Sequence, residues 1–260
     1  MSAYVIADLH LSASTPELLS AFKRFVSNLN VGDELYILGD LFNFFVGLDK
    51  SNIAQQVVAR ALKEAEERSI KAYFIKGNRD FLMTAKEAKY LGLTLLDDIS
   101  LLKLSNKSVM FSHGDLFCTN DEDYQRYYRL VNNKALQVFF RLLPLFVRRQ
   151  IASRIREQSK ESHYHRRDPL IYGIVPDSVA LKAQELLVLK AQAEPSLWQD
   201  VSKLDCVVHG HIHEFESFIN ESPVVEKRYV LGAWGSKFSY WAIDQDGKII
   251  FSEQALTSLS

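Results

Sequence analysis

The chain has 260 residues, a formal net charge of −1, 47% hydrophobic residues and 24% charged residues. This near-neutral balance argues against a nucleic-acid partner held by a strong positive field, and the hydrophobic content is enough for a sizeable core. The two cysteines, Cys118 and Cys206, give no disulfide framework and make a reducing compartment the default. We expect a cytoplasmic protein, because no signal peptide precedes the first predicted strand and no run approaches about 18 apolar residues.

The first 115 residues alternate predicted strands and helices. Apolar segments at 3–7, 35–38, 72–75 and 109–111 predict strands. A helix is predicted to begin at Thr15-Pro16, because proline is favoured at the first helical position. A second helix is predicted over 51–68, and its expected buried face contains Ile53, Val57, Ala61 and Ala65. This order with short links predicts an α/β fold, in which helices pack against a sheet.

Residues 119–200 interrupt this alternation and predict consecutive helices, ahead of a fifth strand at 206–208. The rest of the chain predicts strands at 214–219, 227–231, 238–243 and 248–251, with Asp246-Gly247 as a hairpin turn. We therefore divide the chain into a core of residues 1–118 and 201–260 and a helical insertion of residues 119–200.

The insertion combines an apolar patch with many basic residues. The apolar patch surrounds Pro144 and comprises Leu136, Phe139, Phe140, Leu142, Leu143, Leu145, Phe146 and Val147. Eight basic residues lie between 141 and 167, against the two acidic residues Glu157 and Glu161: Arg141, Arg148, Arg149, Arg154, Arg156, Lys160, Arg166 and Arg167. Two interpretations remain open. One is a helical hairpin packed on the core with a solvated basic face, and the other is a lid that binds acyl chains on its apolar side and phosphates or anionic headgroups on its basic side.

Five polar segments each follow one of the predicted strands: Asp8-Leu9-His10, Gly39-Asp40, Gly77-Asn78-Arg79-Asp80, His113-Gly114-Asp115 and Gly210-His211-Ile212-His213. They place carboxylate, imidazole and amide groups at the ends of strands that we expect to share one sheet. Each segment alone has an ordinary structural explanation, such as a helix cap or a turn. The ordered set of five predicts a site for two divalent metals, which activate water against phosphate esters without a protein nucleophile.

This ordered set resembles the calcineurin-like metallophosphoesterase family over nearly the whole chain. The resemblance implies a four-layer αββα sandwich with an inserted helical lid. It also implies one metal held by Asp8, His10 and His213, a second held by Asn78, His113 and His211, and a bridge between the two through Asp40. Oxygen and imidazole ligands without thiolate favour Mn²⁺, Fe²⁺, Mg²⁺ or Zn²⁺. We expect His209 to be a core or supporting residue, and neither cysteine to be a ligand.

Arg79 stands where many relatives in this family carry a histidine, the usual candidate for protonating the leaving group. Arginine does not donate a proton usefully near neutral pH, but its planar guanidinium grips phosphate oxygens. A phosphate monoester leaves with little protonation, so Arg79 favours cleavage of a pyrophosphate over cleavage of a simple alkyl phosphate. The structural alternative is a pairing of Arg79 with Asp80 or Asp115.

A further set of motifs resembles the UDP-2,3-diacylglucosamine diphosphatases, a family of enzymes in lipid A biosynthesis. These motifs lie at residues 8–11, 38–42, 77–82, 113–115, 118–125, 142–148, 159–160 and 231–234. The resemblance implies hydrolysis of the pyrophosphate bond of UDP-2,3-diacylglucosamine to UMP and 2,3-diacylglucosamine 1-phosphate, by a hydroxide that two Mn²⁺ ions activate. It implies catalytic roles for Asp40, Asn78 and Arg79. The substrate contacts that it implies are Asn78, Arg79, Asp121, Ser159, His163, Arg166 and His211.

The same resemblance implies a peripheral protein of the inner membrane of a Gram-negative bacterium. Its partners would be a UDP-linked diacylated glucosamine lipid and an anionic membrane surface, with no obligate protein partner. The chain departs from the family pattern at Asn43, Phe45, Gly47, Leu48, Asp49, His163, Arg166, Gly173 and Glu214. These departures affect the expected substrate contacts rather than the expected metal ligands.

Two alternatives stay open at the level of the sequence. One is a metallophosphoesterase that acts on another nucleotide pyrophosphate or phosphodiester, with residues 136–147 buried in the core. The other is a catalytically inactive scaffold with the same fold. A scaffold is expected to have lost metal ligands, whereas every expected ligand position is filled in this chain.

Overall fold

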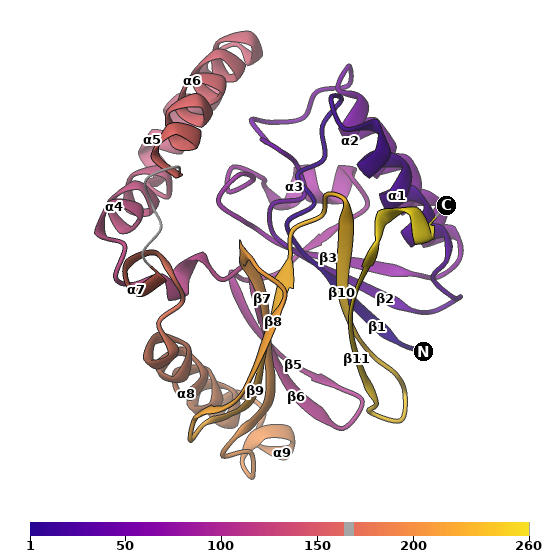
Figure 1. Ribbon diagram of the computed structural model, residues 1–260, viewed down its shortest axis with the longest axis vertical. Coiled ribbons are helices and arrows are strands. Elements are labelled where there is room, and N and C mark those ends of the chain that lie inside the picture. The colour runs from indigo at the N-terminus through magenta and orange to yellow at the C-terminus, as the bar shows by residue number, and fades with distance from the viewer. Residues whose placement is uncertain (164–168, 260) are drawn as a thin grey trace.

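A computed structural model describes the backbone of residues 1–163 and 169–259. Within these ranges it describes the side chains of all residues except those from 156 to 170. Two sheets face each other (Figure 1). The first has the order β11-β10-β1-β2-β3-β4 and consists of β1 (Ala3–Ile6), β2 (Glu34–Leu38), β3 (Lys71–Ile75), β4 (Thr94–Leu95), β10 (Lys237–Ile243) and β11 (Ile249–Ala255). The second has the order β5-β6-β7-β9-β8 and consists of β5 (Ile99–Leu104), β6 (Lys107–Ser112), β7 (Leu204–His213), β8 (Glu216–Ser222) and β9 (Val225–Gly232).

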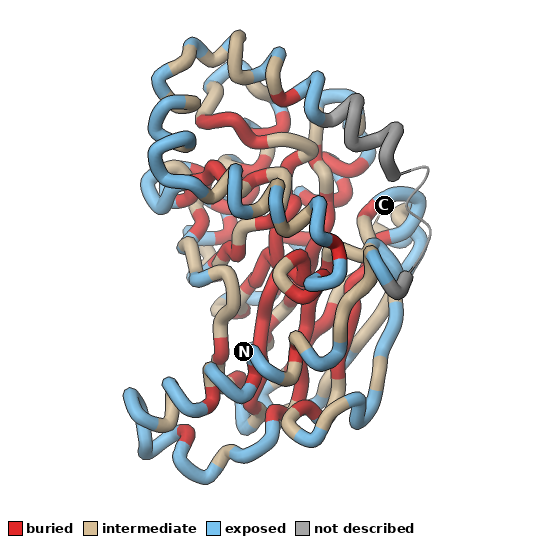
Figure 2. The backbone as a smooth tube through the Cα atoms, turned by 90° about the vertical axis from the view of Figure 1, so that its left-hand side faces the viewer, coloured by how far each residue is buried: buried red, intermediate tan, exposed pale blue. Residues whose placement is uncertain are grey.

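An apolar layer fills the space between the two sheets. Val5 and Leu38 of the first sheet pack in one cluster with Phe111 and Val208 of the second, and all four are fully buried. Figure 2 shows the buried residues concentrated along the strands in the interior of the molecule. Trp241 of β10 lies in the same layer and has no exposed surface. The sheets are therefore held face to face by burial of large apolar side chains.

Helices α1 (Pro16–Ser27) and α2 (Ile53–Glu67) cover the outer face of the six-stranded sheet. Phe22 of α1 and Val58 of α2 join the core cluster that includes Ile37 of β2. The amphipathic spacing of both helices explains this placement, because the apolar side of each helix has to be buried against another element.

Helices α8 (Pro176–Ala193) and α9 (Pro195–Trp198) cover the other sheet. Val179 and Leu187 of α8 pack with Val207 of β7 in a third cluster. The order of layers is therefore helix, sheet, sheet, helix, which confirms the predicted αββα sandwich. The boundaries of the inserted domain at 119 and 200 stay a proposal, and the part of the insertion in α8 and α9 forms this outer layer.

The start of α2 corrects one expectation. The Asn52 side chain accepts a hydrogen bond from the backbone amide of Gln55 at 3.1 Å and caps the helix. The buried face contains Ala54, Val58, Ala61, Leu62 and Ala65. The assignment of Ile53 to that face was wrong, because Ile53 is 53% exposed. At the start of the helix Ala54 and Val58 are buried, whereas Ala61 and Ala65 are buried as predicted, and Ile53 faces solvent.

Four further helices make up most of the insertion: α4 (Glu122–Val131), α5 (Lys134–Leu142), α6 (Leu145–His163) and α7 (Pro169–Tyr172). In Figure 1, α4, α5 and α6 extend along one side of the sandwich. Phe139, Leu142 and Phe146 are 61%, 79% and 63% exposed, so much of the predicted apolar patch lies on the surface. Within the described residues, no helix is long and apolar enough to cross a membrane. The short elements that remain are α3 (Ala85–Tyr90), η1 (Asp115–Phe117) and η2 (Leu256–Leu259).

Three arginines join α5 and α6 to loops of the core. Arg141 pairs with Glu87 at 3.0 Å. Arg148 donates a hydrogen bond to the Val46 carbonyl, and Arg149 pairs with Asp49. Core carboxylates and carbonyls therefore already hold these three basic residues of the insertion.

The expectation that the five polar segments follow strands of one sheet was also wrong. Strands β1, β2 and β3 are parallel neighbours in the six-stranded sheet, whereas β6 and β7 are parallel neighbours in the other sheet. The carboxyl ends of parallel strands lie at one edge of their sheet. Because the two sheets are stacked, these two edges lie together and bring the five segments to one place.

We predict that Trp241→Ala lowers the free energy of unfolding by about 3–5 kcal/mol, because it removes a large side chain from the layer between the sheets. Denaturant unfolding followed by circular dichroism measures the change. Tyr90→Ala is the control: Tyr90 is 55% exposed, and its loss should change the free energy of unfolding by less than about 0.5 kcal/mol. A loss below about 1 kcal/mol for Trp241→Ala would contradict the packing described for this layer.

Candidate metal centre

The predicted ligands come from the ends of five strands, β1, β2, β3, β6 and β7: Asp8, His10, Asp40, Asn78, His113, His211 and His213. The last two were expected to follow the strand predicted at 206–208. Strand β7 instead continues through His213, and its pairing with β9 is irregular between His209 and His213. A bulge of this kind re-aims side chains without ending the strand, so it turns His211 and His213 toward the other segments.

The backbone at most of these ligands is left-handed. The φ angles are 55° at Asp8, 49° at His10, 51° at Asp40, 74° at His211 and 66° at His213. Non-glycine residues in this region cost on the order of 1–3 kcal/mol each, and such strain concentrates at functional sites. In the described part of the chain, the other non-glycine residues with positive φ are Ser69, Ser105 and Asn220. The strained positions therefore coincide largely with the predicted ligands.

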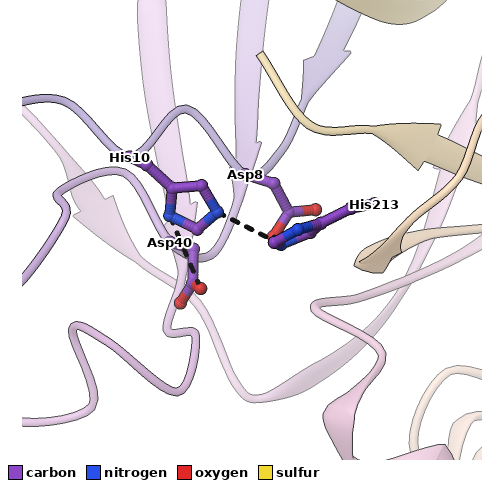
Figure 3. Close-up of side chains that lie close together, drawn as sticks. All are labelled: Asp8, His10, Asp40 and His213. Atoms are coloured by element: carbon purple, nitrogen blue, oxygen red, sulfur yellow. Dashed lines mark hydrogen bonds and ion pairs between the residues drawn. The ribbon is translucent and has the colours of Figure 1, made fainter. Parts of the chain in front are cut away.

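Four of the predicted ligands form one cluster (Figure 3). Asp8, His10, Asp40 and His213 each offer one ligand atom, and these four atoms lie within 4.8 Å of one another. His10 Nε2 is 3.1 Å from His213 Nε2, and His213 Nε2 is 3.5 Å from Asp8 Oδ1. His10 Nδ1 is 3.8 Å from Asp40 Oδ2. The four side chains thus converge from three strand ends on one small volume.

Two buried atoms of this cluster, Asp8 Oδ1 and His10 Nδ1, have no hydrogen-bond partner among the described residues. Buried polar atoms nearly always have a partner in folded proteins. A divalent cation would satisfy both atoms, because carboxylate oxygen and imidazole nitrogen are common ligands of such ions. The residues present therefore fit a metal at this position.

His113 and Asn78 form a second group beside Asp40. His113 Nδ1 lies 2.9 Å from the Leu38 carbonyl, which accepts its N–H. His113 Nε2 lies 2.9 Å from Asn78 Oδ1 and 3.7 Å from Asp40 Oδ1. A neutral imidazole that donates through Nδ1 presents an Nε2 lone pair to these two oxygens, an arrangement that a cation stabilises. The His211 ring, 5.1 Å from the His113 ring between centroids, borders the same group.

The electrostatics of His10 and His211 agree with metal binding. Burial, together with the charge of Arg79, lowers the pKa of His10 to about 3. Burial likewise lowers the pKa of His211 well below its ordinary value. Both rings are therefore neutral near pH 7 and have lone pairs for a metal. Burial also acts to lower the pKa of His113, but Asp40 and the other nearby carboxylates outweigh it and raise this pKa to about 9.

Asp80 holds the loops of the site in place. It is fully buried and accepts hydrogen bonds from the backbone amides of Gly77 at 2.7 Å and Leu41 at 2.8 Å. Burial, and then the charge of Asp40, raise the pKa of Asp80 to about 7. A Cβ at Gly77 would collide with the Asp40 carboxylate, so the close approach of the two loops requires glycine there. A role of Asp80 in this turn could have been predicted from the sequence. Asp80 ends the turn Gly77-Asn78-Arg79-Asp80, and aspartate side chains in turns typically accept hydrogen bonds from nearby backbone amides.

Arg79 faces the metal ligands rather than the carboxylates expected in the structural alternative. Its Nε lies 3.2 Å from Asp40 Oδ2, and its Nη1 donates to Asn43 Oδ1 at 3.2 Å. Asp80 is occupied by the backbone amides described above, and Asp115 accepts a hydrogen bond from the Tyr124 hydroxyl at 2.6 Å. The guanidinium therefore lies beside the predicted metal ligands.

His209 lies behind the ligands and is fully buried. Its Nε2 is 3.1 Å from Arg228 Nη1, and its Nδ1 is 2.9 Å from the Gly210 carbonyl. Arg228 in turn pairs with Glu221 at 2.6 Å. Burial and the charge of Arg228 lower the pKa of His209 to about 3. The expectation of a buried core histidine beside the site is confirmed.

The predicted substrate contacts of the insertion are placed only in part. Asp121 is 7% exposed and caps α4, because its carboxylate accepts a hydrogen bond from the Tyr124 amide at 2.9 Å. The side chains of Ser159 and His163 lie outside those described, and Arg166 lies outside the described residues. Their roles stay predictions.

Comparisons with known proteins agree with this geometry. The family model for calcineurin-like phosphoesterases matches residues 1–215. The chain belongs to this family. As a calcineurin-like phosphoesterase it is a metal-dependent hydrolase, and its Asp and His cluster is the feature expected for divalent metal. The family membership removes the reason to retain the scaffold alternative, because the ligand set is complete.

Curated relatives match the chain over nearly its full length. The UDP-2,3-diacylglucosamine hydrolase of Photorhabdus laumondii is 37% identical over 247 residues, covering 94% of this chain and 95% of that protein. The protein of the same name in Proteus mirabilis is 34% identical over 250 residues, covering 95% and 96%. That of Escherichia coli O17:K52:H18 is 36% identical over 250 residues, again covering 95% and 96%.

We predict that Asp40→Asn lowers the divalent metal content per chain and reduces hydrolysis roughly 100-fold or more, because a neutral amide holds metal ions less well than a carboxylate. Metal analysis of the Mn²⁺-loaded protein and a phosphodiester assay measure the two effects. Asp200→Asn is the control, because Asp200 is exposed and is not one of the predicted ligands. It should change neither the metal content nor the rate of hydrolysis. Normal metal content together with normal turnover in Asp40→Asn would contradict the site.

Proposed function

We propose that this chain hydrolyses the pyrophosphate bond of UDP-2,3-diacylglucosamine and releases UMP and 2,3-diacylglucosamine 1-phosphate. The observation that carries the proposal is the identity of 34–37% to curated UDP-2,3-diacylglucosamine hydrolases over about 95% of both chains. The convergence of a complete set of ligands at one edge of the sandwich supports it chemically.

The proposed cofactor is a pair of Mn²⁺ ions. One would be held by Asp8, His10 and His213, and the other by Asn78, His113 and His211, with Asp40 shared between them. When bound, such ions lower the pKa of water and neutralise the charge that develops on phosphate oxygens. The chain itself supplies the neutral imidazoles of His10 and His211 and the short loops that aim them inward.

Arg79 is the proposed phosphate-holding residue. Its guanidinium is anchored by Asp40 and Asn43, so it is oriented before substrate arrives. A positioned guanidinium binds two phosphate oxygens at once and stabilises negative charge as it develops. Because the leaving group is a phosphate monoester, the site needs no histidine at this position to protonate it.

The insertion is the proposed lid for the lipid part of the substrate. Its α5 and α6 expose Val138, Phe139, Leu142 and Phe146, and each of these side chains is at least 60% exposed. A hydrolase of soluble nucleotides was expected to bury this patch. The observed exposure therefore favours an acylated substrate and a role at an anionic membrane surface, the proposed inner membrane of a Gram-negative bacterium.

We predict metal-dependent release of UMP when the protein meets UDP-2,3-diacylglucosamine in detergent with Mn²⁺. Arg79→Ala should slow this reaction roughly 10²- to 10³-fold, because one positioned charge is lost, while the metal content stays intact. Arg79→Lys should restore only part of the rate, because an ammonium cannot bind two oxygens in a fixed plane.

The assay includes bis(4-nitrophenyl) phosphate as a substrate without lipid or nucleotide. Turnover of this diester alone by the wild-type protein would retain the metal centre and reject the lipid substrate. An equal loss of metal in Arg79→Ala would show that Arg79 supports the ligands rather than the phosphate.

We predict that Phe139→Ser and Phe146→Ser each raise the KM for UDP-2,3-diacylglucosamine roughly tenfold, because each removes apolar surface that would contact an acyl chain. Steady-state kinetics in detergent measures the change, with bis(4-nitrophenyl) phosphate as the reference substrate. Leu189→Ser is the matched control, because Leu189 on α8 is 59% exposed and lies outside α5 and α6. An unchanged KM in both phenylalanine variants would contradict the lid.

A further inference from the structure

A second surface adjoins the metal centre, away from the exposed apolar residues of α5 and α6. It is a small cleft that is partly open to solvent. Asn78 lines it and is also the expected ligand of the second metal. The residues that line it, in the described part of the chain, come from the loop after β3, the segment 98–116 and α4 with the turn after it. None belongs to α5 or α6.

One wall of the cleft is an aromatic face of α4. Tyr124, Tyr127, Tyr128 and Val131 all line the cleft, and their spacing of three and four residues places them on one side of a helix. The Tyr124 ring centroid is 6.3 Å from that of Tyr127 and 6.4 Å from that of Tyr128. All three tyrosines are partly exposed, and all three line the cleft.

Tyr124 fixes this wall relative to the metal centre. Its hydroxyl donates to the buried Asp115 at 2.6 Å, and its ring centroid is 5.6 Å from that of His211. The aromatic wall is therefore attached to the loop that follows β6 and to a predicted metal ligand. A ligand in the cleft would begin at the reacting phosphate and extend along α4.

The rim of the cleft is polar and has little uncompensated charge. Lys76 Nζ lies 3.5 Å from Asp98 Oδ1, and Tyr128 also hydrogen-bonds to Asp98. Asn132 lies at the end of the tyrosine row and donates its amide to the Tyr128 carbonyl at 3.1 Å. Aromatic faces with a few amide and ammonium groups at the edge suit a flat heterocycle that carries hydrogen-bonding groups. They suit an acyl chain poorly, because such a chain would leave the polar rim unpaired.

We propose that this cleft binds the uracil and ribose half of the substrate, with the base against the tyrosines of α4. The inference rests on the proposed function, since it assumes a uridine diphosphate linkage at the metal centre. A pyrophosphate at that centre has a substituent on each side. With the acyl chains on α5 and α6, the cleft shares Asn78 with the centre and offers a separate direction for the nucleoside.

The test variant is Tyr127→Ala, because Tyr127 lines the cleft and contacts none of the predicted ligands in the interactions described above. Loss of a base-stacking ring costs about 1–3 kcal/mol, which is roughly a 5- to 150-fold loss of affinity. The inhibition constant of UMP and the KM for UDP-2,3-diacylglucosamine should each rise roughly tenfold. The selectivity for this substrate over bis(4-nitrophenyl) phosphate should fall by a similar factor.

Two further variants make the result specific. Tyr127→Phe keeps the ring and should retain most of the affinity for UMP. Leu130→Ala is the matched control on the same helix, because Leu130 is 59% exposed and does not line the cleft. Equal losses on the lipid substrate and on the diester in Tyr127→Ala would overturn the proposal, because they would show a general structural effect.

Failure of this inference can be separated from failure of the proposed function. If the wild-type protein hydrolyses UDP-2,3-diacylglucosamine but UMP inhibits Tyr127→Ala as strongly as the wild type, the cleft assignment is wrong and the function stands. If the wild-type protein does not hydrolyse that lipid, the proposed function is wrong. Titration of UMP into the Mn²⁺-loaded wild-type protein and the Tyr127→Ala variant then tests directly whether the cleft binds the nucleoside. Equal affinities for UMP would reject this assignment.

Discussion

Two buried carboxylates, Asp8 and Asp40, lie close together at the carboxyl ends of the neighbouring strands β1 and β2, and the negative charge of both has to be compensated inside the protein. Their ligand atoms belong to a cluster that spans no more than 4.8 Å, and the two residues are 0% and 1% exposed. Like charges at this separation and depth repel strongly unless cations or donors surround them. Imidazoles, Arg79 and backbone amides supply part of that compensation, and divalent metal is the natural source of the remainder.

Compensation of this kind requires a rigid support, because the ligands have unfavourable backbone conformations. Five of the predicted ligands have φ between 49° and 74°, and such strain persists only where surrounding packing fixes the chain. The apolar layer between the sheets, with Trp241 and Phe111, provides this packing directly beneath the loops. Asp80 adds a second level of support by binding the amides of two of these loops. The geometry of the polar site therefore depends on the packing of the hydrophobic core.

The core and the insertion have different proposed functions. Chemistry belongs to the core, where short loops leave little freedom to the ligands. In our proposals, the insertion recognises the two halves of the substrate, through apolar side chains exposed on α5 and α6 and tyrosines on α4. Arg141, Arg148 and Arg149 attach α5 and α6 to core segments that include Leu82, Val46 and Asp49. Changes in those segments would therefore alter the seating of the lid without touching the metal ligands.

From the sequence, the strand ends followed by Asp, Asn and His in a fixed order, together with the family resemblance, predicted the metal ligands, and the structure brings Asp8, His10, Asp40 and His213 into one cluster. Hydrophobic periodicity, which is local as well, predicted the alternating strands and helices of the core and the helical nature of residues 119–200, whereas the four-layer αββα class followed from the family resemblance. The sequence did not determine that β6 and β7 lie in a different sheet from β1, β2 and β3, because strand pairing depends on contacts distant in sequence. The partners of Arg79, the role of Asp80, the solvent-facing side of Ile53 and the exposure of Phe139 were likewise decided by tertiary structure. Each of these depends on which surfaces meet across the fold, and residue type and spacing do not contain that information.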